Sequence, residues 1–348
     1  MFPSALPQPR LPQRRDIPSL RWGIIGPGWI ANHFAQALRH HTDQQLVAVA
    51  GRNAEKTQHF AEQWAIPHAY TDTDQMLARP DLDIIYVATP HNHHLPDGLK
   101  VLRAGKHLLV EKPLALNAQE AAQLQREAQA QQRLCLEGMW CDFTPKYDVL
   151  TQLLANGDLG ELHTLLADHG EFFTADHRIF NADLAGGPML DLGSYLIALS
   201  VKVAGGAPER LVATGQSVPG GVNGQASMLL THAGGMHAVL NTTLFSRTPS
   251  GAVIAGRDAT LVLDGHFYAP GDFVLTASQG NHSLRWQDAG NHYAQLCHEM
   301  EHAAWCIGQG RLESPIRPLA TTLTTLGVMD EARRQLGIVF NEERDNHA

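Results

Sequence analysis

Short apolar runs alternate with longer amphipathic segments over residues 20–139. Each run is three to five residues long, as expected of strands buried on both faces. The runs cover residues 21–25, 46–50, 84–88, 107–110 and 134–136. The segments between them have helical character, including one that ends near His40 and one at 119–132. This alternation predicts right-handed crossovers and an α/β domain with a doubly wound parallel sheet, a Rossmann domain.

The pattern changes beyond residue 139. A helix is expected at 145–155, ending at Asn156-Gly157, and strand-like segments then dominate. These segments cover residues 162–168, 211–216, 226–231, 237–243 and 259–263. Ala233-Gly234-Gly235 is a hairpin signal between two of them. The second half therefore reads as an α+β domain with a large, mostly antiparallel open sheet and a helical C-terminus.

The first nineteen residues differ from both halves. They are rich in Pro, Gln and Arg and lack the apolar stretch of a secretory signal. Arg14-Arg15 resembles a twin-arginine signal, but polar residues and a proline follow where that signal is apolar. We expect three parts: a flexible arm (1–19), a dinucleotide-binding domain (20–139), and a domain for substrate binding and oligomerisation (140–348).

Composition limits the classes of binding partner that can be expected. The 348 residues are 44% hydrophobic and 18% charged, with a net charge of −9, which argues against a nucleic-acid binder. No apolar run approaches the roughly 20 residues that span a bilayer. The four cysteines form no CxxC pair, which is typical of reduced thiols in a cytoplasmic protein. A small-molecule partner is therefore expected, and neither nucleic acid nor membrane.

A glycine-rich turn follows the first apolar run. Residues 26–31, GPGWIA, fit the G-x-G-x-x-G/A pattern between a strand and a helix. Gly26 permits the tight turn, Gly28 lets the backbone approach a pyrophosphate, and the helix starting near Trp29 and Ile30 offers N–H groups to phosphate. The pattern predicts a dinucleotide site; a purely structural turn is the alternative.

The end of the second run indicates which dinucleotide binds. Sites for NAD usually place a carboxylate there for the ribose 2′-hydroxyl, whereas this chain has Gly51-Arg52-Asn53. An arginine suits a 2′-phosphate. Arg52 therefore favours NADP, with NAD possible and an exposed surface arginine as the alternative.

Four further segments carry a family resemblance. They are AGKHLLVEKP at 104–113, VATPHNHH at 87–94, EGMW at 137–140 and AGGPMLDLGSY at 185–195. In this order and spacing, over about residues 20–340, the chain resembles the glucose–fructose oxidoreductase/inositol dehydrogenase/MocA family. Ala185 departs from the family's glycine. Tyr195 stands where histidine is more frequent, as in the branch with dimeric dihydrodiol dehydrogenase and NADP-dependent xylose dehydrogenase.

The resemblance implies a catalytic group of Lys112, Asp191 and Tyr195. Hydride transfer to a carbonyl builds charge on its oxygen, which must be protonated. A phenol needs a nearby cation to act as a base at neutral pH, and Lys112 is that cation by resemblance. Asp191 and Tyr195 lie four residues apart on an apolar helix expected at 188–204, so the carboxylate needs a partner there. Lys112 is the expected partner across the two domains.

The resemblance also implies binding residues. Further cofactor contacts are expected from Thr89, Pro90, His91, His94, Glu111 and Lys112. Candidates that line the substrate site are Trp140, Phe143, Phe172, Phe173, His177, Arg178 and Phe180, with ordinary core packing as the alternative for each aromatic. The implied substrate is a sugar, a cyclitol or a dihydrodiol, and a homodimer or homotetramer is expected. His91, His93 and His94 could instead form a metal cluster, but the family uses no metal.

Two other functions compete. His298-Glu299-Met300-Glu301-His302 matches H-E-x-x-H, the helical signature of zinc hydrolases, although the extended form is missing. The second alternative is a non-catalytic, NADP-responsive regulatory protein with the same two domains. Because Lys112, Asp191 and Tyr195 are all present, the enzyme is the favoured hypothesis.

Overall fold

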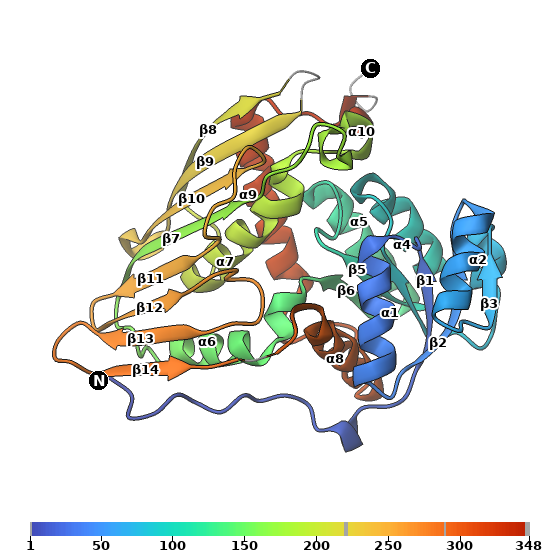
Figure 1. Cartoon of the computed structure of the whole chain (residues 1–348), viewed down its shortest axis with the longest axis horizontal. Helices are drawn as coiled ribbons and strands as arrows, with labels where there is room; N and C mark the ends of the chain where they lie inside the picture. The colour runs from blue at the N-terminus through green and yellow to red at the C-terminus, as the bar shows by residue number, and fades with distance from the viewer. Residues whose placement is uncertain (1, 219–221, 289, 345–348) are drawn as a thin grey trace. The chain divides into compact units, whose positions relative to one another are not determined.

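The computed structural model describes residues 2–218, 222–288 and 290–344 (Figure 1). The chain divides into two compact units, and each is discontinuous in sequence. We call the first the Rossmann unit; it contains Leu11–Thr144 and Asn291–Thr322. We call the second the sheet unit; it contains Met1–Arg10, Pro145–Gly290 and Leu323–Ala348.

The Rossmann unit is built on a parallel sheet of six strands in the order β3-β2-β1-β4-β5-β6. The strands are β1 (Arg21–Ile25), β2 (Gln45–Ala50), β3 (His68–Tyr70), β4 (Ile84–Val87), β5 (His107–Glu111) and β6 (Cys135–Gly138). Five of them confirm the predicted runs to within one or two residues. The short strand β3 was missed because its three residues are only partly buried and show no apolar run.

Helices connect these strands. They are α1 (Trp29–His41), α2 (Ala54–Gln63), α3 (Thr73–Leu77), α4 (His94–Arg103) and α5 (Ala118–Gln131). Three begin where a side chain accepts a hydrogen bond from the first turn: Asn53 for α2, Asp72 for α3 and Asn117 for α5. By contrast, α1 begins at a glycine with no side-chain cap, so its first N–H groups face outward from the turn.

Residues 291–322 belong to the Rossmann unit, which corrects the expected division at residue 139. Helix α8 (Cys297–Gly308) packs against α1. The buried Arg317 binds two carboxylates near the predicted boundary: its Nε lies 2.6 Å from Glu137 Oε2 and its Nη1 2.8 Å from Asp142 Oδ2. Ion pairs between segments about 180 residues apart leave no pattern in the local sequence, so the return of the chain was not predicted.

The sheet unit contains an eight-stranded sheet in the order β14-β13-β12-β11-β7-β10-β9-β8. Its strands are β7 (Leu162–Gly170), β8 (Arg210–Ser217), β9 (Asn223–Thr231), β10 (His237–Thr243), β11 (Ala252–Gly256), β12 (Ala259–Leu263), β13 (Phe273–Ala277) and β14 (Ser283–Trp286). Only β7 and β10 pair in parallel, which confirms the mostly antiparallel prediction. The strands β11, β13 and β14 were not predicted, although β12, which is as long as β11 and β13, was.

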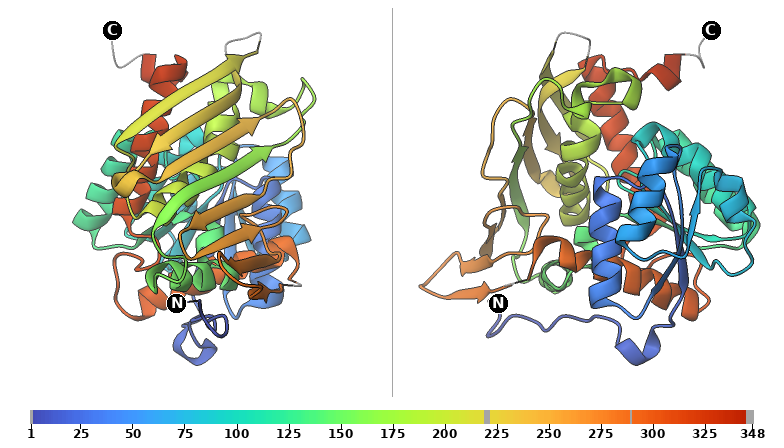
Figure 2. Two further views of the ribbon diagram at one scale, coloured as in Figure 1. Left: turned by 90° about the vertical axis from the view of Figure 1, so that its left-hand side faces the viewer. Right: turned by 45° about the vertical axis from the view of Figure 1, so that its right-hand side comes forward.

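Helices cover one face of this sheet. The unit contains α6 (Pro145–Ala155), α7 (Ser194–Ala204), most of α9 (Leu319–Leu336) and α10 (Asn341–Arg344). In Figure 2, α7 and α9 lie behind the sheet in the left view and on one side of it in the right view. The predicted helix at 188–204 is a π-helical turn, Met189–Gly193, that continues into α7. Residues 182–204 are long and apolar enough for a membrane span, but 83% of the tested window is buried, as in a core helix.

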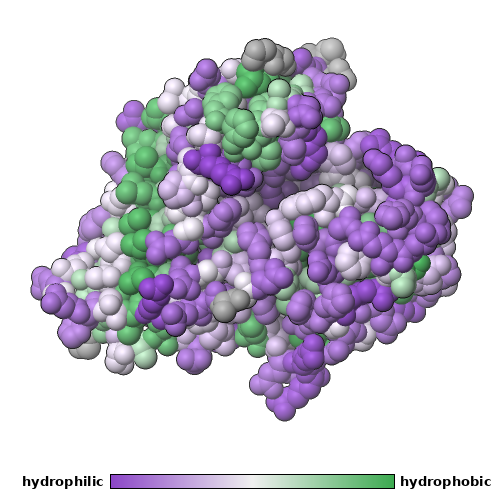
Figure 3. Space-filling view, viewed as in Figure 1, coloured by the Kyte–Doolittle hydropathy of each residue, from purple (hydrophilic) through white to green (hydrophobic). Residues whose placement is uncertain are grey.

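The other face of the sheet carries a continuous apolar row. Val212, Leu229, Val239 and Leu166 lie opposite one another on β8, β9, β10 and β7. Each of these four side chains is 42–47% exposed. The row continues through Val253, Val262 and Val274 on the next three strands. Apolar surface is visible in Figure 3 along the side where these strands lie.

Candidate active site

The glycine-rich turn has the geometry of a phosphate cradle. Gly26 has a φ of +94°, and a Cβ there would lie 2.8 Å from the carbonyl oxygen of Ala88. Around Gly28, in contrast, a Cβ would meet nothing within 4 Å. The turn is thus closed on the protein side and open where α1 begins, and the uncapped N–H groups of α1 suit a pyrophosphate. These residues fit a dinucleotide.

The end of β2 is shaped by close packing. A Cβ on Gly51 would lie 2.5 Å from Thr57 Oγ1 and 2.6 Å from Pro27 Cδ, so the backbone passes close to the phosphate turn. Arg52 follows it, exposed, and Asn53 accepts a hydrogen bond of 2.9 Å from the Lys56 N–H to cap α2. No carboxylate stands at this position of the chain.

His94 joins two loops from within the protein. Its ring is fully buried, with Nδ1 2.8 Å from the Pro113 carbonyl oxygen and Nε2 2.9 Å from the Thr89 carbonyl oxygen. Burial lowers the pKa of His94 to about 4, so the ring is neutral. The predicted direct cofactor contact is therefore wrong for this side chain. It holds the loop of Thr89 and Pro90 beside the one after β5.

Lys112 follows β5 at the carboxyl edge of the sheet. The strands β1, β4 and β5 are neighbours, so the turns that follow them, at Gly26, Thr89 and Lys112, share one edge. Glu111 holds this loop: its carboxylate accepts hydrogen bonds from the Tyr86 hydroxyl and from the Lys112 N–H, the latter at 3.1 Å. Glu111 thus positions the backbone of Lys112 from a largely buried site.

Aromatic rings that the sequence motifs do not indicate lie beside the phosphate turn. Trp29 is 64% exposed and meets His33 and Tyr293 edge-on, at centroid distances of 4.7 and 5.3 Å. His33 stacks on Tyr293 at 4.0 Å. Trp140, a predicted substrate residue, is buried and lies 6.4 Å from the Tyr293 ring. Tyr293 is about 260 residues from Trp29, and no local signal links the two.

The H-E-x-x-H segment forms no metal centre among the described residues. His302 is buried with Nε2 2.8 Å from Ser314 Oγ, and no group of three or more metal-ligating side chains occurs in the described ranges. Glu299 is fully buried, and within those ranges neither of its carboxyl oxygens has a hydrogen-bond partner. Burial, followed by the charge of Glu111, raises the pKa of Glu299 well above its usual value. This carboxyl is therefore the neutral member of a buried pair.

In the sheet unit, Asp191 and Tyr195 lie on the π-helical turn and the first turn of α7. Arg178 reaches Asp191: its Nη2 lies 3.6 Å from Asp191 Oδ2. In the turn before them, Ala185 has a left-handed φ of +53°, a conformation that favours glycine. Glycine is the family's residue at this position. A Cβ on Gly186 would lie 2.4 Å from the Ile179 carbonyl oxygen, so the motif packs tightly on the Arg178 segment.

Tyr195 belongs to an aromatic cluster that the sequence did not indicate. Its ring stacks on Tyr268 at a centroid distance of 4.4 Å and an interplanar angle of 20°. His169, from β7, stacks on the Tyr268 ring at a centroid distance of 4.5 Å, and its centroid lies 5.8 Å from that of Tyr195. His266 Nδ1 is 2.8 Å from the Tyr268 hydroxyl. The predicted acid/base thus belongs to a cluster of four rings from three separate segments.

The remaining candidate substrate residues differ in how far their side chains are exposed to solvent. Phe143 is buried and packs on His302 at 5.0 Å within the Rossmann unit, so it is a core residue and the predicted substrate contact is wrong. Phe173 and Phe180 pack against Ile179, Leu192 and Leu244. His177 Nδ1 accepts a hydrogen bond from the Ile179 N–H and caps a short helix. Among the phenylalanines of this set, Phe172 presents an exposed ring, at 62%.

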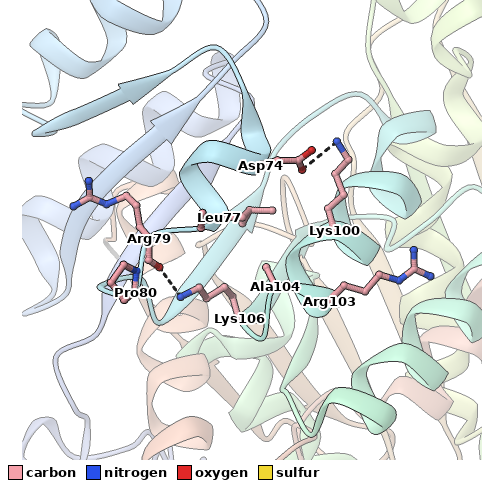
Figure 4. Close-up of a pocket in the computed structure, with 9 residues that line it drawn as sticks. Asp74, Leu77, Arg79, Pro80, Lys100, Arg103, Ala104 and Lys106 are labelled. Atoms are coloured by element: carbon pink, nitrogen blue, oxygen red, sulfur yellow. Dashed lines mark hydrogen bonds and ion pairs between the residues drawn. The ribbon is translucent and has the colours of Figure 1, made fainter.

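A separate surface hollow lies away from this edge. It has a volume of about 510 Å³ and is lined by residues around Asp74, Lys100 and Lys106 (Figure 4). Lys106 donates to the carbonyl oxygens of Arg79 and Leu82, and Lys100 pairs with Asp74 at 3.4 Å. Because Lys106 precedes β5, the hollow lies at the amino end of that strand. Ligands of open α/β sheets bind at the carboxyl ends, so the hollow is not the candidate site.

Comparison with known proteins agrees with this geometry. Residues 20–139 match the GFO_IDH_MocA family, described as an oxidoreductase family with an NAD-binding Rossmann fold. Residues 147–262 match the GFO/IDH/MocA C-terminal domain. The chain belongs to this family. It is an NAD(P)-dependent oxidoreductase, which excludes the zinc hydrolase and regulatory hypotheses.

Two dehydrogenases from vertebrates are similar to this chain over nearly its whole length. The chain is 30% identical over 332 residues to trans-1,2-dihydrobenzene-1,2-diol dehydrogenase of Mus musculus, covering 94% of this chain and 99% of the relative. The Xenopus tropicalis protein of the same name is 31% identical, covering 92% and 99%.

Solved structures share the fold. Aldose–aldose oxidoreductase from Caulobacter crescentus has a TM-score of 0.83 at 24% identity, covering 91% of this chain and 97% of that one. Levoglucosan dehydrogenase with NADH and levoglucosan has a TM-score of 0.83 at 16% identity, covering 92% and 98%.

Proposed function

We propose that this protein is an NADP-dependent oxidoreductase that moves a hydride between the nicotinamide and an alcohol/carbonyl pair of a sugar, cyclitol or dihydrodiol. The arrangement that carries the proposal is Tyr195, one helical turn from an Asp191 that Arg178 approaches at 3.6 Å. A phenol, a carboxylate and a guanidinium gathered at the start of one helix supply proton transfer and hydroxyl recognition.

The cofactor is assigned to the carboxyl edge of the Rossmann sheet. Gly26, Gly28 and Trp29 hold the pyrophosphate, and Arg52 binds the 2′-phosphate of NADP. When bound, the nicotinamide supplies or accepts the hydride. The NADP-bound 3-ketoreductase from Actinomadura kijaniata, similar in fold at a TM-score of 0.81, is consistent with NADP in such a site.

Three side chains carry the proton chemistry. Tyr195 gives its phenolic proton to the substrate oxygen during reduction and takes it back during oxidation. Lys112 stabilises the phenolate and polarises the oxygen, because an opposite charge nearby favours the ionised form. Asp191 orients the ammonium group. Arg178 binds hydroxyl groups beside Asp191, and the rings of Tyr268 and Phe172 offer apolar faces to a pyranose or a dihydrodiol.

The test of this function is a Tyr195→Phe variant. Turnover of NADPH should fall by about 10³-fold, because the phenolic hydroxyl that transfers the proton is removed. The affinity for NADPH should stay the same. A panel of aldoses, cyclitols, anhydrosugars and dihydrodiols, followed by NADPH absorbance, identifies the substrate. Tyr70→Phe, far from α7 in sequence and in the other unit, is the matched control and should keep full turnover. Unchanged turnover in Tyr195→Phe rejects the assigned role.

We further propose that the apolar row of the open sheet face is covered by a second copy of this chain. Four adjacent side chains on four strands, each 42–47% exposed, form a self-complementary patch of the kind found in homodimers. A Val239→Glu substitution places a charge at the centre of the row and should convert the oligomer to a monomer in light scattering. Gln58→Glu, on the surface of α2, should leave the mass unchanged. A monomeric wild-type protein contradicts this proposal.

A further inference from the structure

His169 is held between two hydrogen-bond acceptors. The ring is buried on β7, with Nδ1 3.2 Å from the Leu192 carbonyl oxygen and Nε2 3.1 Å from Glu171 Oε1. The Leu192 carbonyl oxygen and the Glu171 carboxylate both accept hydrogen bonds, so each favours a proton on the ring nitrogen that faces it. The carboxylate also carries a negative charge, which favours a positive charge on the ring.

Glu171 is the charged partner. Its side chain is 38% exposed, so the carboxylate keeps contact with solvent while it binds the buried ring. The hydrogen bond from His169 is the main cause that lowers the pKa of Glu171, against the opposing effect of burial. Glu171 is therefore ionised at neutral pH.

His94 shows why the carboxylate matters. Both of its ring nitrogens also face acceptors, but these are two neutral carbonyl groups. Burial is the main cause that lowers the pKa of His94 to about 4, ahead of the smaller effects of the Lys112 and Glu137 charges. The two buried histidines thus differ in the acceptors they face, and of the two only His169 is hydrogen-bonded to a carboxylate.

His169 lies beside the predicted acid/base. His169 stacks on the Tyr268 ring at 4.5 Å, and Tyr268 stacks on Tyr195 at 4.4 Å. The centroids of His169 and Tyr195 are 5.8 Å apart. At this distance in a buried cluster, a cation favours the ionised form of a phenol. Contact with the Tyr268 face also stabilises the cation.

We propose that His169, kept protonated by Glu171, is a positioning residue that supplies a second cation, besides Lys112, for the phenolate form of Tyr195. Its consequence for turnover rests on the proposed function, whereas the charge coupling itself does not. The pair lies entirely within the sheet unit.

The other ionisable groups around the cluster support this assignment. His266 binds the Tyr268 hydroxyl, and burial, followed by the charge of His169, lowers the pKa of His266, so it is neutral. Asp191, on the turn whose Leu192 carbonyl binds His169, is paired with Arg178. Arg247 and Lys146 act on the same loop, and both oppose a further positive charge on His266. His169 is the histidine of this cluster that has a carboxylate partner.

The first experiment measures the protonation state without a substrate. Imidazole nitrogen shifts of ¹⁵N-histidine-labelled full-length protein, with the His169 signal identified by its loss in His169→Gln, should show both nitrogens protonated at neutral pH. In Glu171→Gln the same signal should become that of a neutral ring. A neutral His169 tautomer in the wild type at neutral pH overturns the proposal.

The second experiment measures the coupling to Tyr195. The chain has six tyrosines, so a ¹³Cζ-labelled signal can be identified by its loss in Tyr195→Phe. Tyr195 should ionise at a pH about one unit higher in His169→Gln and in Glu171→Gln than in the wild type. His163→Gln, an exposed histidine on the same strand, is the matched control and should leave the titration unchanged. Equal titrations in all four proteins overturn the coupling.

Turnover separates this inference from the proposed function. If both hold, the alkaline-shifted Tyr195 of His169→Gln moves the pH profile of kcat to higher pH without changing NADPH affinity. A shifted Tyr195 titration together with unchanged turnover in Tyr195→Phe would reject the catalytic role of Tyr195 but not the charge coupling. Glu171→Gln keeps the shape of the side chain, so it tests the coupling even where His169→Gln fails to fold.

Discussion

The two units prepare their chemistry in different ways. In the Rossmann unit, the cofactor edge is made of backbone: a left-handed Gly26, an open Gly28 and the uncapped start of α1. In the sheet unit, the cluster around Tyr195 is made of side chains from β7, the first turn of α7 and the loop before β13. A backbone site can be specified by a few consecutive residues, whereas a side-chain site needs segments that only folding brings together.

This difference predicts where substitutions separate binding from stability. The largest effect should come from Gly28→Val, whose side chain enters the open space that a pyrophosphate needs. NADPH affinity should fall by about 100-fold or more, with little change in the melting temperature, because no protein atom lies within 4 Å of the new Cβ. Isothermal titration and thermal unfolding measure the two quantities.

Gly26→Ala is the matched control. Its Cβ would meet the Ala88 carbonyl at 2.8 Å with φ at +94°, so it should destabilise the fold by about 2 kcal/mol. Equal melting temperatures for the two variants would contradict the division between the closed and open sides of the turn.

A smaller effect should come from Arg52→Ala. The loss of a charge-assisted contact should weaken NADPH binding by about 10- to 100-fold and leave NADH binding nearly unchanged. Lys56→Ala, an exposed cation on the next helix, serves as the control. A parallel loss for both cofactors would mean that Arg52 contributes to general binding and not to the 2′-phosphate.

The smallest effect concerns Glu299, which tests the buried interior of the Rossmann unit. Its folded-state pKa is raised, so above the usual value of 4.5 the folded protein keeps a proton that the unfolded chain has lost. The free energy of unfolding should therefore fall as pH rises through that window, by at most about 1.4 kcal/mol per pH unit.

Glu299→Gln should flatten this dependence in denaturant titrations at several pH values. Glu55→Gln, on the exposed first turn of α2, should leave it as in the wild type. The same slope in Glu299→Gln and in the wild type would show that other groups cause the pH dependence.

Much of the fold could be predicted because its signals are local. The strands at 21–25, 84–88 and 107–110 are continuous apolar runs, and each lies within one residue of the observed strand. Strands β11, β13 and β14 were not predicted, whereas β12, a strand of similar length in the same sheet, was. The placement of 291–322 also escaped prediction, because Arg317 is bound by carboxylates about 180 residues earlier.

The sequence by itself determined the glycine-rich turn after the first strand, the arginine at the end of the second strand, and the motifs that name Lys112, Asp191 and Tyr195. Each depends on backbone conformation or on a motif within a few residues. Only the tertiary structure decided that Phe143 is core, that His94 is a neutral pin between two loops, and that His169 faces Glu171 beneath Tyr195. Burial and the identity of the acceptors govern a histidine's charge. Glu171 is only two residues from His169, but the burial of the ring and its Leu192 contact come from segments that folding brings together.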